Sequence, residues 1–400
     1  MKITVHCTAL LLAALPISAG PFEDTFGAGA RNKALGGAGL SIAEDYTATF
    51  YNPSLLALCR GSRLSMGYDL VHTSLNNPNP AAEQLGTYQS LNLGFCLKPL
   101  NQVGIGIYSN YSLGPMEFTA STLNTQPKFI MYAGDLKAFS MMMGTGYSPF
   151  KQLSFGAAMS LSTSVNLDTD LDINLTRSPP IVAKFPAQIT PIVGAIVGVT
   201  AVPMRDWKIS LVYRSATYGQ IDIKAAARLK PLFTTTAAAT IKGLLSYSPH
   251  QIALGSSYLL KENWLLTADA TYYFWSNYPG PFLEINAPEN SVTGRIKIAG
   301  IEAPNFSDVI VPRAGLEYAV WEKLKLRAGY SFRTTPAPFP AQKAQLLDAN
   351  THRISLGAGY EFQLYQNVFV IADAFLSADI LQGGRGSVIN TGLLVGAEYD

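Results

Sequence analysis

The chain has few charged residues for its length. Only 14% of its 400 residues are Asp, Glu, Lys or Arg, whereas 48% are hydrophobic. A soluble domain usually carries about 25% charged residues. The 29 basic residues nearly balance the 27 acidic ones, and no basic run is present that could neutralise phosphates. This composition argues against nucleic acid as a partner and is unusual for a soluble domain.

Long apolar runs are also scarce, and the first of them is short. Residues 1–19 combine a positive start at Lys2, an apolar core over residues 9–15 and a small-residue cleavage site that ends at Ala19. These are the features of a secretory signal peptide. The alternative is a membrane anchor, but the stretch is shorter than the roughly 18 apolar residues a span needs, and Pro16 interrupts it.

The rest of the chain contains no candidate transmembrane helix. Its longest nearly apolar run, Pro191 to Met204, is too short to span a bilayer and is bracketed by prolines. Lipid admits only helices and closed β-barrels, because every backbone polar group must be paired within the protein. A charge-poor exported chain without a spanning helix therefore predicts a transmembrane β-barrel.

Period-two alternation supports this fold class. Leu64, Met66 and Tyr68 alternate with residues such as Ser65 and Asp69, which gives a strand one apolar and one polar face. Outer-membrane barrels repeat such segments of about ten residues many times. The sequence contains fourteen of them, at residues 62–73, 88–98, 102–112, 138–148, 152–165, 189–202, 207–219, 249–260, 264–275, 309–320, 324–333, 351–363, 368–377 and 388–399.

The connections between these segments alternate strictly between short and long. Six are turns of a few residues. The others run from about ten to more than thirty residues and include 113–137, 166–188, 220–248 and 276–308. Short periplasmic turns and long extracellular loops are typical of outer-membrane barrels. We therefore predict an all-β, antiparallel transmembrane barrel of about 14 strands over residues 61–400, in the outer membrane of a Gram-negative cell and in contact with its lipid.

Residues 20–60 precede the first strand and do not follow its pattern. They are rich in Gly and Ala and end in an apolar stretch from Ala48 to Leu58. A segment of this length that enters from the periplasm has room to fold into the lumen. We predict an N-terminal plug, and the alternative is a loose periplasmic extension.

Histidine and cysteine are rare, which restricts the chemistry. His72, His250 and His352 remain after signal cleavage, and none lies in a recognisable triad or metal-ligand motif. No phosphate-binding loop is present, so we expect no catalysis, no metal and no cofactor. Cys59 and Cys96 both fall near a predicted periplasmic turn on inward-facing positions. The oxidising periplasm permits a disulfide between them, and two unpaired buried thiols are the alternative.

Two stretches carry distinctive motifs. The first, Glu44 to Ala57 (EDYTATFYNPSLLA), contains Asn52, Pro53 and Ser54. The second begins with residues 311–318 (VPRAGLEY) and continues through residues 326–330 (LRAGY), 333–336 (RTTP) and 348–360 (DANTHRISLGAGY). The first resembles the plug segment, with its Asn-Pro-Ala signature, and the second the late strands of the FadL/TodX family of outer-membrane transporters for long-chain fatty acids and hydrocarbons.

This resemblance implies a monomeric barrel of fourteen strands that is plugged by its N-terminus and passes hydrophobic small molecules inward. It also implies lateral exit through a gap at a kinked third strand. In this chain the third predicted strand carries Gly104, Gly106 and Asn110. Glycines inside a strand can mark a bulge or bend, so these positions are our candidates for the exit.

The inward-facing residues suggest a ligand. Arg313, Arg333 and Arg353 fall in the extracellular half of neighbouring strands, where a guanidinium could bind the carboxylate of a fatty acid. A ladder of Arg–Glu pairs that stiffens the lumen is the favoured alternative for these arginines. Phe369 and Phe375 also face inward, which suits a hydrophobic pocket better than a water-filled pore. Long-chain fatty acids are thus the first predicted substrate. The alternatives are hydrocarbon uptake, a general porin, or a structural outer-membrane barrel.

Overall fold

The computed structural model describes residues 22–76, 87–113, 138–164, 167–173, 181–189, 192–228, 236–279, 283–286, 296–297, 305–336 and 349–399. The predicted signal peptide and much of the 113–137 connection lie outside these residues.

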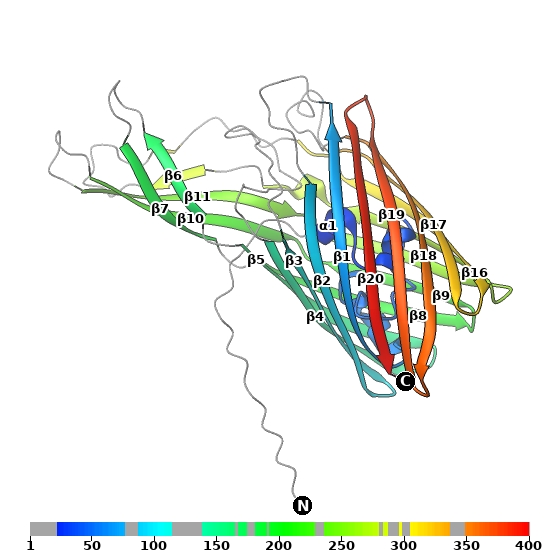
Figure 1. The fold of residues 1–400 in the computed structure, drawn as a ribbon. Coiled ribbons are helices and arrows are strands. Elements are labelled where there is room, and N and C mark those ends of the chain that lie inside the picture. Colours follow the sequence, from blue (N-terminus) through cyan, green and yellow to red (C-terminus); the bar gives the residue numbers. More distant parts are fainter. Residues whose placement is uncertain are drawn as a thin grey trace, which may run out of the picture.

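A closed antiparallel barrel forms the body of the protein (Figure 1). The prediction of fourteen strands is confirmed, and the last strand pairs with the first over their full lengths. The barrel strands are, in order around the wall, β1 (Ser62–Leu75), β2 (Thr87–Leu100), β3 (Val103–Ser112), β4 (Ala138–Phe150), β5 (Leu153–Ser164), β8 (Ile192–Met204), β9 (Trp207–Arg214), β12 (Gln251–Leu260), β13 (Trp264–Tyr273), β16 (Val309–Trp321), β17 (Leu324–Arg333), β18 (Thr351–Tyr365), β19 (Val368–Leu381) and β20 (Gly386–Tyr399).

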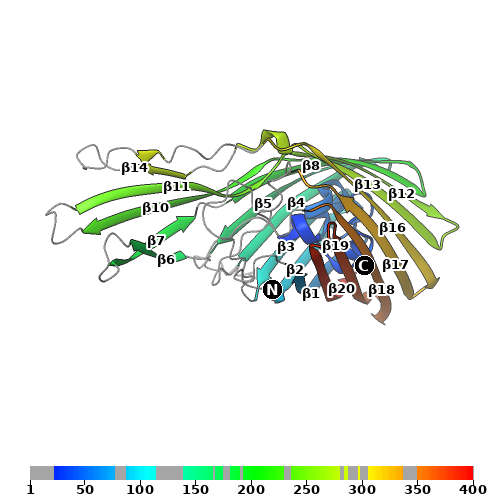
Figure 2. The same ribbon diagram turned by 90° about the horizontal axis from the view of Figure 1, so that it is seen from above.

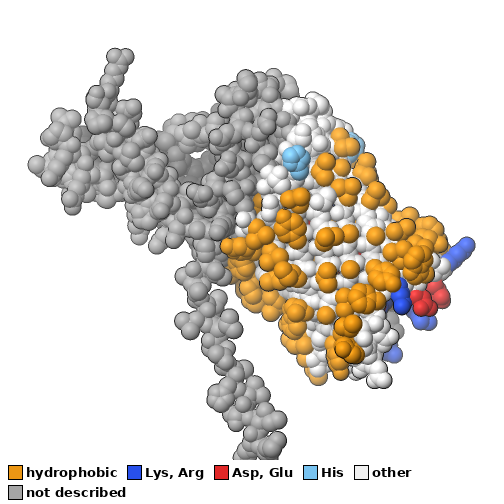
Figure 3. All heavy atoms as spheres, viewed as in Figure 1, with side chains coloured by type: hydrophobic (Ala, Val, Ile, Leu, Met, Phe, Trp, Pro, Cys, Tyr) orange, Lys and Arg blue, Asp and Glu red, His pale blue; other side chains and the backbone are white. Residues whose placement is uncertain are grey.

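The alternation along the strands separates the outer surface from the lumen. On β1, Leu64 is 61% exposed, whereas its neighbour Ser65 is only 1% exposed. Figure 3 shows hydrophobic side chains over the visible face of the wall, with the few visible charged side chains gathered toward one edge. Apolar surface left in water costs about 25 cal/mol per Å². A bilayer removes this cost, so the outer surface of the barrel is suited to lipid.

Some long connections contain strands of their own, and this corrects the prediction that they are loops. A second sheet has the order β15-β14-β11-β10-β7-β6 and extends away from one end of the barrel (Figure 2). Its strands are β6 (Leu167–Ile173), β7 (Ile181–Ile189), β10 (Thr217–Arg228), β11 (Thr236–Ser248), β14 (Leu283–Asn286) and β15 (Ile296–Lys297). Alanine-rich stretches such as 225–227 and 237–239 pair in this sheet. They lack the apolar–polar contrast from which strands were recognised in the sequence.

The short turns that the sequence predicted and the C-terminus lie at one end of the barrel (Figure 1). In outer-membrane barrels this is the periplasmic end. The second sheet lies toward the opposite, extracellular end. At that end, the ten-residue connection predicted between the last two strands is a short turn over residues 382–385, because β19 and β20 both extend further than predicted.

Residues 22–60 fold into short helices inside the ring of strands (Figure 2). We call them the N-terminal segment. Its helices are α1 (Phe22–Phe26), α2 (Ala30–Ala34), α3 (Ala48–Tyr51) and η1 (Pro53–Leu58). Helix α2 contacts β17 to β20, whereas η1 contacts β3, β4, β5 and β8 on another part of the wall. The segment therefore bridges the lumen.

Glycine allows this segment to turn sharply against the wall. Gly36 follows α2 with a φ of 68°, a conformation that L side chains rarely adopt. A Cβ at Gly36 would lie 2.7 Å from the backbone nitrogen of Tyr330 on β17. Both the backbone angle and the close approach therefore require glycine here.

Candidate functional site: the lumen and the segment within it

Ion pairs join the N-terminal segment to the lumen wall at five places. The wall partners lie on three strands at separate positions around the barrel, two on β1, two on β9 and one on β16. The pairs are Asp24–Arg214, Arg31–Glu317, Lys33–Asp69, Glu44–Lys208 and Asp45–Arg63. Charges on a Gly- and Ala-rich segment thus match opposite charges on the strands.

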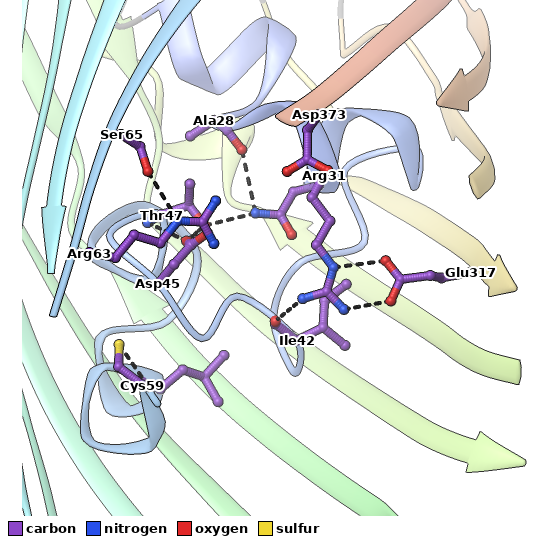
Figure 4. Close-up of polar contacts among 12 residues, drawn as sticks. Ala28, Arg31, Ile42, Asp45, Thr47, Cys59, Arg63, Ser65, Glu317 and Asp373 are labelled. Atoms are coloured by element: carbon purple, nitrogen blue, oxygen red, sulfur yellow. Dashed lines mark hydrogen bonds and ion pairs between the residues drawn. The ribbon is translucent and has the colours of Figure 1, made fainter. Parts of the chain in front are cut away.

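The most extensive of these contacts is a chain of alternating charges around Arg31 (Figure 4). Arg31 donates two hydrogen bonds of 2.9 Å to the carboxylate of Glu317 on β16. Arg327 on β17 donates to the same carboxylate at 2.6 Å and also pairs with Asp373 on β19. Burial lowers the pKa of Arg31, but the carboxylates of Glu317, Glu44 and Asp373 together outweigh burial and leave this pKa above its usual value. The chain ties the segment to β16, β17 and β19.

A second buried network starts from Lys33. Its ammonium group lies 2.7 Å from Asp69 on β1, and Asn92 on β2 donates to the same carboxylate at 2.6 Å. The amide oxygen of Asn92 accepts hydrogen bonds from Tyr108 and Asn110 on β3. Asn110 therefore belongs to a polar network that joins the segment to three strands, which is a different setting from the exit that we predicted for it.

The Asn52-Pro53-Ser54 motif is fully buried in the lumen. The amide nitrogen of Asn52 donates to the Leu40 carbonyl at 2.9 Å and to the Thr200 hydroxyl on β8 at 2.8 Å. Its amide oxygen accepts from the backbone nitrogen and the hydroxyl of Ser54. The amide nitrogen and oxygen of Asn52 and the backbone nitrogen and hydroxyl of Ser54 thus all have protein partners. One of these partners, Thr200, lies on the wall.

Glycines of the wall form a cradle for the motif and for η1. A Cβ at Gly198 would lie 2.1 Å from the Asn52 side chain, and one at Gly156 would lie 2.2 Å from the Pro53 backbone. At Gly104 on β3 the added Cβ would lie 1.8 Å from the Leu56 carbonyl oxygen. Larger residues at these positions would exclude the segment, which explains why glycine occurs there.

The third strand shows no kink in its pairing. Its register with β4 runs from Val103–Tyr147 to Tyr111–Phe139 without a shift. The shift between β2 and β3 lies next to their turn. Gly104 and Gly106 accommodate η1, and their part in a lateral exit stays a prediction.

Two adjoining cavities lie between the segment and the extracellular end. The outer cavity has about 580 Å³ of space, part of it open to solvent, and is lined mainly by apolar and aromatic side chains such as Tyr247, Trp275, Val309 and Val311. The inner cavity, of about 610 Å³, is more polar. Asp24, Thr25 and Tyr273 line both, so the two spaces meet at α1.

The aromatic lining of the outer cavity belongs to a larger cluster. Tyr247, Trp275, Tyr278 and Phe306 pack together with Val309 and Val311 at the extracellular end of the barrel. Neighbouring ring centroids in this cluster lie 5.2 to 6.1 Å apart. Such a surface suits an apolar molecule.

The three predicted arginines have different surroundings. Arg353 lines the inner cavity but donates two 2.6 Å hydrogen bonds to Asp379, so its charge is already paired. Arg333 lines the outer cavity and has a partner of its own. Arg313 lines the inner cavity and donates to the hydroxyls of Thr271 and Tyr273, and it has no carboxylate within 4.0 Å among the described residues.

The two predicted phenylalanines do not line these cavities. Phe375 is buried beneath the segment, where the Lys33 ammonium lies 5.2 Å from its ring centroid. Phe369 pairs with Gln363 and Glu398 near the periplasmic end. Inward parity was predicted correctly, but it does not reveal which inward residues the segment covers.

A buried carboxyl group stands beside the inner cavity. One oxygen of Glu23 accepts a 2.8 Å hydrogen bond from Ser140, and the other has no hydrogen-bond partner among the described residues. Burial raises the pKa of Glu23 above its usual value. The charged form of this group is therefore disfavoured while α1 occupies its place.

The periplasmic mouth of the lumen has a different character. A cavity of about 750 Å³ lies there, and charged side chains dominate its lining, including Arg60, Lys323, Lys325 and Glu398. Among the described residues, no group of three or more His, Cys, Asp or Glu side chains is placed to hold a metal ion.

The profile of the outer membrane protein transport protein family (OMPP1/FadL/TodX) matches residues 9–375. The chain belongs to this family. The chain is also similar to alkane uptake protein A of Marinobacter nauticus. The two are 23% identical over 345 residues, which cover 79% of this chain and 73% of that protein.

Solved structures of the family have the same fold. The Pseudomonas putida toluene transporter TodX is similar with a TM-score of 0.63 and 18% identity, and the match covers 94% of this chain and 99% of TodX. A Pseudomonas aeruginosa FadL homologue is similar with a TM-score of 0.60 and 16% identity, covering 93% and 98% of the two chains. This family membership and the closed barrel identify an outer-membrane transport protein for hydrophobic compounds.

The ion pairs between the N-terminal segment and the wall were not predicted from the sequence. Arg–Glu pairs were considered only within the wall, and no role was assigned to Arg31 or Lys33. Isolated charges in a Gly- and Ala-rich stretch were the available signal, since a buried charge requires an opposite partner. The aromatic residues Tyr247 and Trp275 were missed because they lie at the edges of long connections.

Proposed function

We propose that the protein passes hydrophobic compounds inward and that the N-terminal segment is the plug that gates their passage. The observation that carries this proposal is the arrangement of the two cavities. An apolar outer cavity leads to an inner cavity, and the segment occupies the lumen below both. A general porin needs an open aqueous path, which a lumen filled in this way does not offer.

Movement of the segment is required for passage in this scheme. Its upstream part holds all five ion pairs with the wall, including Asp24–Arg214 beside the inner cavity. Such contacts can exchange for water when the segment shifts. A ligand that enters from the outer cavity meets α1 first, so we place the initial movement at α1.

We propose lateral release into the membrane as the final step. The charged lining of the periplasmic cavity supports this, because a hydrophobic molecule gains nothing by entering it. The uninterrupted pairing of β3 means that release at this strand requires the ladder to open. Lateral release therefore predicts a transient separation of strands.

Long-chain fatty acids are the first candidate substrate. Arg313 supports them, because its guanidinium lines the inner cavity with two hydroxyl partners and, within the described ranges, no carboxylate partner. A fatty-acid carboxylate could replace these hydroxyls while its chain extends into the apolar outer cavity. Arg353 contributes less than the sequence suggested, since Asp379 already neutralises it.

Uncharged hydrocarbons are the second candidate. The aromatic lining of the outer cavity favours them, and the names of an alkane uptake protein and a toluene transporter among the similar proteins point the same way. A hydrocarbon makes no use of Arg313. The role of this one side chain therefore distinguishes the two candidates.

The decisive experiment compares binding of oleate and hexadecane to purified wild-type protein and to Arg313→Gln. Fatty-acid transport predicts that the variant loses affinity for oleate at least tenfold and keeps its affinity for hexadecane. Arg205→Gln, at an exposed periplasmic turn, is the matched control. Equal oleate binding by wild type and Arg313→Gln would favour hydrocarbon uptake. Failure of both compounds to bind wild-type protein would reject the function proposed here.

A further inference from the structure

Two buried thiols lie where the N-terminal segment leaves the lumen. Cys59 directly follows η1, and Cys96 is on the lumen side of β2. They belong to the same buried cluster, and the Cys96 thiol and burial together raise the pKa of the Cys59 thiol. The structure holds the reduced form of this pair.

The surroundings hold both residues at this position. Cys96 is the register partner of Gly106 on β3, and a Cβ at Gly106 would lie 2.5 Å from the Leu56 side chain. The Cys59 backbone nitrogen donates to the Leu56 carbonyl at 3.3 Å. On the other side, Lys98 on β2 donates to the Cys59 carbonyl at 2.6 Å. Cys59 is thus fixed next to β2 by contacts that do not involve its sulfur.

We propose that Cys59 and Cys96 form a disulfide in the exported protein, which covalently joins the end of the N-terminal segment to β2. The oxidant is the disulfide of a periplasmic thiol–disulfide oxidoreductase, which reacts before the barrel closes over the pair. One cysteine thiolate attacks this disulfide and forms a mixed disulfide. The second thiolate then attacks the mixed disulfide. The two cysteines lose two protons and two electrons, and the oxidoreductase disulfide is reduced to two thiols.

The bond divides the segment into an anchored and a movable part. Residues 52–59 rest in the glycine cradle and have no ion pair among the described contacts, whereas all five ion pairs lie within residues 24–45. A covalent tether at Cys59 keeps the anchored part in the lumen. Gating, which rests on the proposed function, is then confined to the upstream part.

Thiol mapping tests the bond directly. Membranes from cells that produce the full-length protein are lysed in the presence of an alkylating agent, and the unfolded protein is digested without reductant. We expect a single cross-linked peptide that contains Cys59 and Cys96, which separates after reduction. Recovery of both residues in alkylated form from unreduced wild-type protein would overturn the proposal. Cys59→Ser and Cys96→Ser are the controls, because each must expose one alkylated thiol.

Hydrogen exchange tests the anchoring. We expect residues 53–59 to exchange at least tenfold more slowly in the oxidised protein than in Cys59→Ser/Cys96→Ser, with little change in residues 24–45. Equal exchange of residues 53–59 in both proteins would overturn the tether. Uptake of hexadecane or oleate by the oxidised protein is expected, and uptake only after reduction would contradict confinement of gating to the upstream part. Absence of uptake in both forms would reject the proposed function and leave the thiol result standing.

Discussion

Replacing Asn52 by Ala should release the anchored part of the N-terminal segment while leaving the barrel intact. The side chain is fully buried and makes four hydrogen bonds, to Leu40, to Thr200 and twice to Ser54. A buried hydrogen bond contributes about 0.5–1.5 kcal/mol, and an orphaned partner costs somewhat more. Because two of the four bonds are local to the motif, we expect docking of the segment to weaken by about 2–4 kcal/mol. This corresponds to a roughly 30- to 700-fold larger undocked population.

Hydrogen exchange of residues 22–60 in detergent measures this population, and heat-modifiable migration of the unboiled protein reports whether the barrel is closed. The Asn52→Ala variant should lose protection in the segment and keep a closed barrel. Thr200→Val removes the partner on the wall, and combining the two changes should cost less than their sum by about 1 kcal/mol. Asn76→Ala is the control, because its exposed amide only donates to the Gly384 carbonyl. Unchanged protection in Asn52→Ala would refute the reasoning.

Three further predictions address packing, pH and charge. Gly156→Val should prevent docking of the segment, because even a Cβ there would lie 2.2 Å from the Pro53 backbone, and limited proteolysis should then cleave the segment in a closed barrel. The raised pKa of Glu23 means that docking of α1 is strongest below pH of about 4.5 and weakens as pH rises through the raised value. Exchange of α1 should therefore accelerate with pH beyond the intrinsic rate in wild type but not in Glu23→Gln, and a wild-type profile in that variant would contradict the assignment. Glu317→Gln should increase the exchange of α2 at least tenfold, because Arg31 loses a buried carboxylate, whereas unchanged exchange would show that this ion pair does not hold the segment.

The candidate site was only partly predictable. Inward parity correctly placed Arg313, Arg353 and Phe375 on the lumen side, because side-chain alternation is a local property of a strand. Parity does not reveal what stands opposite each residue. Asp379 neutralises Arg353, and the segment covers Phe375, so of the predicted ligand residues on the inner cavity Arg313 alone is without a carboxylate partner among the described residues.

The glycines of the third strand illustrate the same limit. The sequence indicated Gly104 and Gly106 as positions of interest within a strand. Glycine occurs both where a strand bends and where another backbone approaches closely, so the sequence does not distinguish the two cases. The contact of these two glycines with Leu56 joins residues almost fifty positions apart. Nothing local in either stretch could have revealed this contact.

The sequence by itself determined the barrel and its fourteen strands, with strand ends placed within about five residues of the observed ones. Alternation is a local pattern, so it can be read from each segment alone. Only the tertiary structure decided which charges of the segment meet which charges of the wall, and where the cavities remain. Those contacts depend on how a chain of Gly- and Ala-rich turns folds back inside a closed ring. The physical reason is that pairing across the lumen joins distant residues, for which a single sequence carries no periodic signal.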